Sequence, residues 1–348
     1  MRNISSLQAL SVTAALTLLS GCAGASSTFA PDAASPQSGA HRAMSRMPSA
    51  WDRLNGLRVR AGRHFTSFDA CPATGPIVYA SDDNNNIVNI YAGKFAGQAP
   101  CGQIASSAFN FPYGLYVKTD THDLYVANDG NVLVFHRGMT TAYNTYVDPS
   151  NQAVDNVEIT RDGTVIACNF GQIGGSERGS LSTWIAGSNG GTFVGNFPMS
   201  NDVFGGFLTV QKNGTVYFND LDNSGVGLLW SVSCPAGACG AQTQIAGVAL
   251  AAPAGLGSDD AEDLLAVDQG ANTADTFELP NPNPKTFPLT GIVYGMALNR
   301  LDRHLFVADA LNNDAAEYAY PSGALIGTVP GTAGGNLIGI AIDPGHAR

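Results

Sequence analysis

The residues best placed to do chemistry are Asp and Asn side chains that end short apolar segments at intervals of 41 to 51 residues. They are Asp82, Asn128, Asn169, Asp220, Asp268 and Asp309. An oxygen at a strand end either binds a cation or closes an Asx turn onto its own backbone, and we expect the turn. The run from Asp82 to Asn86 is a candidate calcium site, but it lacks the glycine-spaced loop and distal glutamate of a calcium-binding loop. We therefore predict a turn there and no cofactor.

The nucleophiles and bases of the chain form no recognisable catalytic set. His122 and His304 fall in expected hairpin turns and His136 at a strand end, so we expect all three to be exposed to solvent. Cys168 lies in the apolar stretch TVIACNF and is expected to be a buried thiol that packs as a small hydrophobe. No catalytic residue and no metal site is predicted.

The segments that carry the polar residues have the pattern of short β-strands. The segments are IVYASD at 77, DLYVAND at 123, TVIACNF at 164, TVYFNDL at 215, DLLAVDQ at 263 and HLFVADA at 304. A second apolar strand precedes all but the first of them, and the turns at residues 161–163 and 212–214 contain the Asp-Gly and Asn-Gly pairs of tight hairpins. Third strands follow at residues 131–135 and 315–320. A period near 45 residues is typical of four-stranded propeller blades.

The first of these segments has no strand before it, whereas the last strand of the chain, residues 336–344, has none after it. GIAID at 339–343 is offset by 44 residues from GMALN at 295–299, which is the period of the array. The sequence therefore predicts an all-β, six-bladed propeller over residues 64–348, closed by a C-terminal strand that completes blade one. A seventh blade from residues 51–70 and an open β-sandwich are the alternatives.

The N-terminal region has the features of an export signal. Residues 1–21 contain Arg2, an apolar run from Ala9 to Leu19 and small residues before Cys22. Leu-Ser-Gly-Cys at 19–22 resembles the lipobox of bacterial lipoproteins. This resemblance implies cleavage before Cys22 and acylation of that residue, with palmitate-type chains anchoring the protein to the cell envelope, at the outer membrane because Ala23 is not Asp. Residues 22–63, rich in Ala, Ser and Pro, are predicted to be a flexible linker.

Charge and cysteine content limit the partners and the compartment. The formal net charge of −11 argues against nucleic acid as a partner. An exported chain can form disulfides, and spacing favours Cys71–Cys101 and Cys234–Cys239. Trp51, Trp184 and Trp230 are expected to be packing residues.

Two stretches carry a resemblance to known propellers. Residues 112–135 and 293–320 resemble the blades of NHL-repeat proteins and of the wider group that contains the regucalcin/gluconolactonase family and virginiamycin B lyase. The resemblance implies that a lactonase would hold a divalent metal with side chains at Tyr113, Asp155 or Asn156, Gly205, Ala254, Tyr294 and Ile338. Only Asp155 or Asn156 is a suitable oxygen ligand, so we do not expect lactonase chemistry. A lyase of the virginiamycin type would need a histidine base beside a metal.

The same positions suggest a binding surface at the mouth of the central channel. The predicted residues are Tyr113, Asp155, Asn156, Asn201, Asp202, Phe204, Tyr294 and Asn336. Aromatic, amide and carboxylate groups together suit a small polar ligand or an envelope protein. Tyr113 and Tyr294 packing only between blades is the competing interpretation. The sequence therefore favours a membrane-anchored, non-catalytic binding module, with a metal-dependent lactonase or hydrolase and a structural scaffold as alternatives.

Overall fold

A computed structural model describes residues 70–72, 74–93, 95, 97–150, 152–170, 178–199, 204–221, 226–299 and 303–345, with Phe204 and Gly205 described as backbone alone. The predicted signal peptide, lipidation site Cys22 and linker, together with Trp51 and the alternative seventh blade, all fall within residues 1–70, almost wholly outside these ranges. No helix in the described ranges is both long and apolar enough to cross a membrane.

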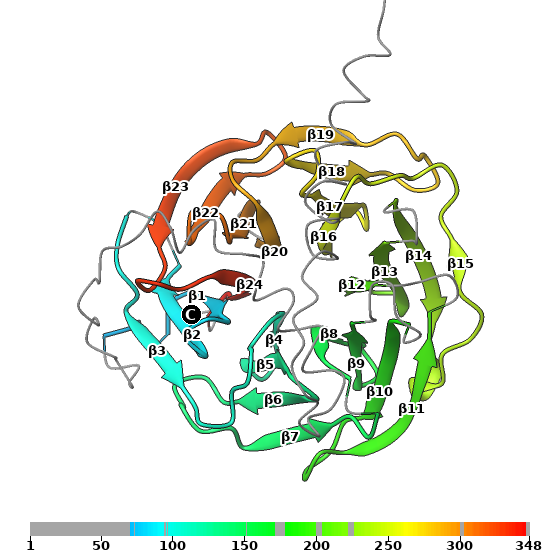
Figure 1. Cartoon of the computed structure of the whole chain (residues 1–348), viewed down its shortest axis with the longest axis horizontal. Coiled ribbons are helices and arrows are strands. Elements are labelled where there is room, and N and C mark those ends of the chain that lie inside the picture. Colours follow the sequence, from blue (N-terminus) through cyan, green and yellow to red (C-terminus); the bar gives the residue numbers. More distant parts are fainter. Residues whose placement is uncertain are drawn as a thin grey trace, which may run out of the picture.

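The described strands form six sheets of four antiparallel strands each, arranged as a ring (Figure 1). Blade one contains β24 (Leu337–Asp343), β1 (Ile77–Asp82), β2 (Ile87–Ala92) and β3 (Gly102–Ala105). Blade two contains β4 (Leu115–Lys118), β5 (Asp123–Asn128), β6 (Asn131–Phe135) and β7 (Asn144–Val147). Blade three contains β8 (Val154–Ile159), β9 (Thr164–Asn169), β10 (Ser180–Ile185) and β11 (Thr192–Pro198).

The second half of the ring repeats this order from the channel outward. Blade four contains β12 (Phe204–Val210), β13 (Thr215–Leu221), β14 (Gly227–Ser233) and β15 (Thr243–Gln244), with the short 3₁₀ helix η1 (Pro235–Gly237) before β15. Blade five contains β16 (Pro253–Ser258), β17 (Leu264–Asp268), β18 (Thr273–Phe277) and β19 (Lys285–Pro288). Blade six contains β20 (Val293–Asn299), β21 (His304–Asp309), β22 (Asp314–Ala319) and β23 (Ala324–Pro330).

The predicted ring closure is confirmed. Strand β24 pairs antiparallel with β1, with Ile342 opposite Val78 and Ile340 opposite Ala80. In Figure 1 the red C-terminal strand lies beside the blue first strand of the same blade. Both ends of the described chain are thereby joined in one sheet, and β24 covers the edge of β1 that would otherwise be unpaired.

Apolar side chains between neighbouring blades form the core. Trp184 and Trp230 are buried there, as expected for packing residues, and Cys168 is buried and outside any disulfide. The hairpin turns at residues 161–163 and 212–214 have the positive φ angles that favour glycine, 89° at Gly163 and 87° at Gly214. Local turn chemistry and alternating apolar residues therefore account for the blades.

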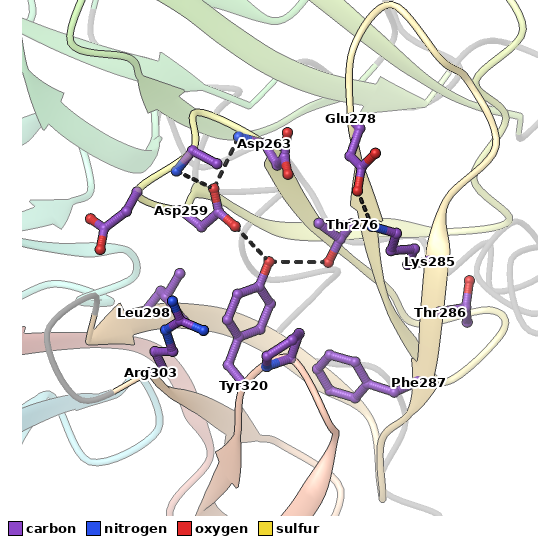
Figure 2. Close-up of a pocket in the computed structure, with 13 residues that line it drawn as sticks. Asp259, Asp263, Thr276, Glu278, Lys285, Thr286, Phe287, Leu298, Arg303 and Tyr320 are labelled. Carbon is purple, nitrogen blue, oxygen red and sulfur yellow. Dashed lines mark hydrogen bonds and ion pairs between the residues drawn. The ribbon is translucent and has the colours of Figure 1, made fainter.

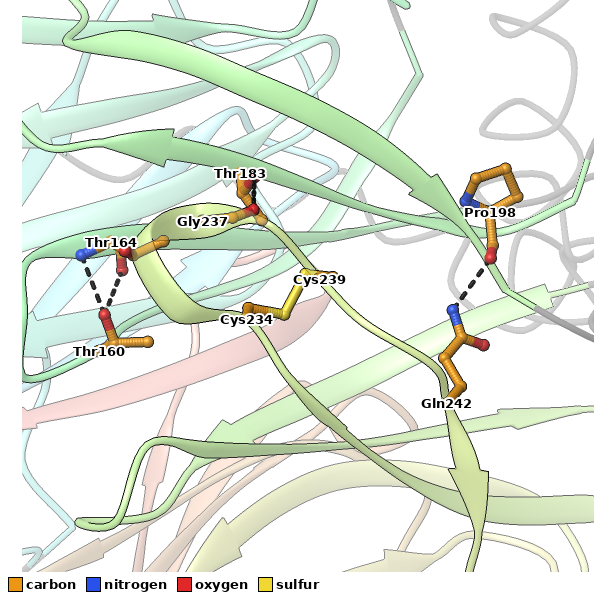
Figure 3. The surroundings of a disulfide bond; sticks show 8 residues. All are labelled: Thr160, Thr164, Thr183, Pro198, Cys234, Gly237, Cys239 and Gln242. Carbon is orange, nitrogen blue, oxygen red and sulfur yellow. Dashed lines mark hydrogen bonds between the residues drawn. A yellow bond between two sulfur atoms is a disulfide. The ribbon is translucent and has the colours of Figure 1, made fainter.

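Both predicted disulfides, Cys71–Cys101 and Cys234–Cys239, are present. Figure 3 shows that the loop closed by Cys234–Cys239 lies against blade three. The Thr183 hydroxyl donates to the Gly237 carbonyl at 2.6 Å, and the Gln242 amide donates to the Pro198 carbonyl at 2.9 Å. The small loop of blade four is therefore bound to the outer strands of the preceding blade.

Candidate functional site

The second strand of every blade ends, and the innermost strand begins, on one face of the ring, which we call the mouth face. The opposite face, where these two strands are joined by hairpins, is the base face. Near the mouth the innermost strands depart from regular pairing: register shifts fall between Val154 and Asn156 in β8 and between Val293 and Met296 in β20. A β-bulge re-aims the side chains within it. Asp155 and Tyr294 lie in these two bulges, away from the regular alternation of the sheet.

Glycines let the innermost strands approach one another at the mouth. A Cβ atom on Gly339 would lie 2.1 Å from the Tyr113 carbonyl oxygen, and one on Gly295 would lie 2.5 Å from the Ile338 carbonyl oxygen. A Cβ on Gly114 would lie 2.6 Å from the Asp155 carbonyl oxygen. These contacts leave no room for a side chain. This role of the glycines was not predicted, although each of the segments YGLYVK, AGLGSD, YGMALN and LIGIAID contains a glycine near its start.

The recurring Asp and Asn residues act mainly as structural anchors. Asp309 Oδ1 accepts from the backbone N–H of Leu311 at 2.9 Å, within its own turn, and from that of Ile292 at 3.1 Å, just before the innermost strand. Asp268 Oδ1 likewise accepts from Gly270 at 3.0 Å and from Ala252 at 2.9 Å. Each carboxylate therefore ties the end of the second strand to the start of the innermost strand, which fits the expected Asx turns.

Several predicted mouth residues lie together in the structure. Tyr113, just before β4, and Asp155 are buried, and Tyr294 is partly buried beside Tyr113 and Ile338 in one apolar cluster. The Tyr113 ring packs edge-on against Phe170 with centroids 5.4 Å apart. Burial, together with the charge of Asp155, raises the pKa of Tyr294 to about 12. The tyrosines thus pack between blades and also lie near enough to the mouth carboxylates to feel their charge, so the two interpretations of them are compatible.

The remaining predicted mouth residues differ in their roles. Asn156 is engaged in the fold, since its Oδ1 accepts from the Leu208 backbone N–H at 3.4 Å. Asn336 precedes β24, and its backbone N–H donates to Asp82 at 3.1 Å. Asn201 and Asp202 lie outside the described residues, and Phe204 begins β12 with its side chain outside them as well.

Asp83 is a mouth residue that the sequence analysis placed only in a turn. It follows β1, is 2% exposed, and its backbone N–H donates to the Asn336 carbonyl at 3.3 Å. Burial raises the pKa of Asp83 to about 7, with the neighbouring Asp82 charge adding to the rise and a hydrogen bond from the Asn336 side chain opposing it. Its contacts with Asn336 depend on ring closure, because the segment before β24 supplies them.

The prediction of solvent-exposed histidines is wrong for His122 and His304 and confirmed for His136, whose side chain is 56% exposed. Each places Nδ1 on a carboxylate: His122 on Asp343 at 2.8 Å, His136 on Asp123 at 2.7 Å and His304 on Glu317 at 2.5 Å. His122 is buried, His304 is partly buried, and the more exposed His136 stacks on Tyr143 with ring centroids 3.6 Å apart. All three lie at or toward the base face, so none of the described histidines is positioned as a base at the mouth.

A hollow opens at the base face between blades five and six. It measures about 360 Å³ and is lined by acidic, basic and aromatic side chains (Figure 2). Some of its polar groups bond to each other: the Tyr320 hydroxyl donates to Asp259 at 3.0 Å, and Lys285 forms an ion pair with Glu278. These internal pairs leave fewer of its polar groups available to a ligand.

Comparison with protein-family profiles finds no match, and comparison with curated protein sequences finds none either. Among solved structures, the chain is similar to one in a nidogen/laminin complex, with 13% identity and a TM-score of 0.61 over 77% of this chain and 98% of that chain.

It is also similar to a functionally unknown protein from Desulfotomaculum acetoxidans DSM 771, with 12% identity and a TM-score of 0.52 over 78% of this chain and 100% of that chain. Virginiamycin B lyase from Staphylococcus aureus matches with 12% identity and a TM-score of 0.50 over 74% of this chain and 84% of that chain. At these identities the similarity shows the propeller fold alone.

Proposed function

We propose that this protein is a lipid-anchored binding module of the bacterial cell envelope, and that the channel mouth is its binding surface. The observation that carries the proposal is the composition of the mouth: Tyr113 and Tyr294 stand with the buried carboxylates of Asp83 and Asp155. Aromatic surfaces with a few fixed polar groups are typical of ligand sites. The nearby Asn336 adds an amide to this set.

The envelope location is supported by the lipobox-like residues 19–22 and by the disulfides. Disulfides persist in oxidising compartments such as the periplasm and are rare in the cytosol of mesophilic bacteria. Cys71–Cys101 and Cys234–Cys239 are both formed in the fold. A linker of residues 22–63 would hold the propeller away from the membrane surface.

The binding role can be tested with a thermal-shift panel of sugars, short neutral peptides, amino acids and organic amines on the purified full-length protein. We expect at least one class to raise the melting temperature of the wild type and to lose most of that effect in Tyr294→Leu. A matched variant on the base face, Lys285→Ala, should respond like the wild type, since its exposed side chain is remote from the mouth.

Two results would contradict the binding proposal. The first is a ligand whose effect survives Tyr294→Leu but disappears in Lys285→Ala, which would place the site at the base face. The second is turnover of a lactone or ester by protein that contains stoichiometric calcium or zinc, which would favour the metal-dependent hydrolase.

Lipidation makes a separate prediction. The wild-type protein, expressed in a bacterial host, should incorporate an alkyne-labelled palmitate and partition with membranes, whereas Cys22→Ser should do neither. Cys168→Ser is the matched control, because Cys168 is buried within β9 and cannot be a lipidation site in the folded protein. Labelling of Cys22→Ser at the wild-type level would exclude Cys22 as the anchor.

A further inference from the structure

The carboxylate of Asp83 has an unsatisfied oxygen in the interior of the mouth. The residue is 2% exposed, and its Oδ1 has no hydrogen-bond partner among the described residues. A buried acceptor without a donor costs about 1 to 3 kcal/mol, and more when it carries charge. The Asn336 side chain hydrogen-bonds to the carboxyl group but leaves this oxygen without a donor. The free oxygen is therefore a place for a donor that comes from outside the chain.

A second buried carboxylate lies in the same part of the ring. Asp155 is 3% exposed and occupies the bulge of β8. Burial alone accounts for the rise of its pKa well above the usual range, and within the described ranges no side-chain hydrogen bond or ion pair offsets that rise. Both Asp83 and Asp155 are close enough to Tyr113 and Tyr294 for their charges to raise the pKa of both hydroxyls. The four side chains therefore lie within electrostatic range of one another, near the start of the innermost strands.

Positive charge is divided unequally between the two faces of the ring, although both faces carry carboxylates, those of the base face including Asp120, Asp162, Asp260, Glu262 and Glu278. The carboxylates of the mouth face include Asp82, Asp83, Asp129, Asp155, Asp268 and Asp309. The described lysines and arginines of the base face are Lys118, Arg137, Arg161, Lys212, Lys285 and Arg303. Arg178 is the one lysine or arginine that the described ranges place on the mouth face. A surface with this sign of charge concentrates cations and repels anions.

We infer that the mouth binds an organic cation, with an ammonium group between Asp83 and Asp155 and its alkyl chain against Tyr113 and Tyr294. This inference rests on the mouth being the binding surface. An ammonium group supplies the donors and the positive charge that the two carboxylates lack, and aromatic faces attract cations. A metal ion fits less well, since the described residues contain no group of three His, Cys, Asp or Glu side chains that could hold one.

The affinity should depend on pH through Asp83. Its carboxyl must be ionised to pair with an ammonium group, and burial holds its pKa at about 7. Alkyl ammonium groups stay charged below about pH 10, as lysine does. Asp155 must be ionised as well, and burial raises its pKa well above the usual range, so binding should tighten as the pH rises from 6 to 8 and should continue to tighten above 8 while the ammonium group keeps its charge. The same shift makes the unliganded fold lose stability as the pH rises from about 4 to 7, because the folded state keeps a proton that the unfolded state releases.

The experiment measures binding of cadaverine, with 1,5-pentanediol as its uncharged counterpart, by titration calorimetry on the full-length protein at pH 8 and low salt. Cadaverine should bind the wild type and pentanediol should not. Asp83→Asn and Asp155→Asn should each weaken cadaverine binding at least tenfold. Asp260→Asn, which removes an exposed carboxylate on the base face, should leave the affinity unchanged.

Folding of the variants is checked independently of binding. Asparagine mimics the neutral carboxyl, so Asp83→Asn should unfold at a higher temperature than the wild type at pH 8 and at a similar temperature at pH 4. Asp155→Asn provides a second variant on a different blade. A variant that melts cooperatively and has lost cadaverine binding supports the inference.

Four outcomes would overturn it. Equal binding of pentanediol and cadaverine, or tight binding of calcium that displaces cadaverine, would show that the mouth recognises something other than an organic ammonium group. Loss of cadaverine binding in Asp260→Asn but not in Asp83→Asn would place the amine at the base face. Binding of a neutral sugar that Tyr294→Leu abolishes, without any amine binding, would reject the inference and leave the proposed binding function intact.

Discussion

An Asp343→Ala variant is expected to lose about 3 to 5 kcal/mol of unfolding free energy, as breaking a buried ion pair typically does. Asp343 ends the closing strand β24 and is fully buried. Its carboxylate pairs with Arg137 and with His122 Nδ1, at 2.8 Å for the histidine. Without it, the largely buried Arg137 guanidinium would keep only its hydrogen bonds to the Pro72 and Gly75 carbonyls. These acceptors are neutral and would not balance its positive charge. The C-terminal strand would lose its ion pairs with blade two.

Urea denaturation followed by circular dichroism measures this loss. Asp120→Ala is the matched control: Asp120 pairs with Lys118 at 3.1 Å, but its side chain is 69% exposed. Exposed pairs contribute about 0 to 1 kcal/mol, so the control should unfold close to the wild type. If Asp343→Ala were as stable as Asp120→Ala, the buried ion pair would not contribute to the stability of the closed ring.

The closure itself could be predicted because its signals are local and repeated. No innermost strand precedes Ile77, and the strand at 337–343 has no second strand after it to pair with. The last strand also follows the previous innermost strand by one period of the array. Alternating apolar residues and Asp-Gly or Asn-Gly turns set the strands of each blade by short-range physics. Pairing of β24 with β1 follows once the blades exist, because each innermost strand needs a neighbour.

The histidine partners could not be predicted, because they depend on contacts across the whole chain. His122 and Asp343 are 221 residues apart and meet only when the ring closes. Hairpin turns are usually solvated, so the expectation of exposed histidines followed the local pattern. The pattern failed where the end of the closing strand covers the neighbouring hairpin.

The mouth residues were only partly predictable, because some follow from the repeat and others depend on contacts formed when the ring closes. Position within the repeat identified Tyr113, Asp155 and Tyr294, whose burial in the structure agrees with a shared location. Asp83 was missed because an acidic residue in an Asn-rich turn is usually exposed. Its burial arises from Asn336, which lies 253 residues further along the chain and reaches Asp83 through closure. The division of positive charge between faces likewise becomes visible only when each loop is assigned to a face.

Closure and the mouth also share one junction. The Ser81 hydroxyl donates to the Tyr113 carbonyl at 2.5 Å and accepts from the Gly339 backbone N–H at 2.8 Å. This serine therefore joins the first strand, the closing strand and the segment that carries a mouth tyrosine. A change that moves β24 should displace Tyr113 and Asn336 together, so stability and ligand binding are expected to fall in parallel when this junction is disturbed.

A Gly339→Ala variant is expected to lose about 3 kcal/mol or more of unfolding free energy, at the upper end of overpacking effects. The added Cβ would lie 2.1 Å from the Tyr113 carbonyl oxygen and 2.8 Å from Ser81 Oγ. The first of these atoms is backbone and cannot rotate away, so β24 and β4 must separate. Gly240→Ala is the control, since its Cβ would meet only the Ser233 carbonyl at 3.7 Å. Thermal melts and cadaverine titrations of both variants test the junction: Gly339→Ala should lower the melting temperature and the affinity, and a variant indistinguishable from Gly240→Ala would contradict a closure built on direct backbone contact.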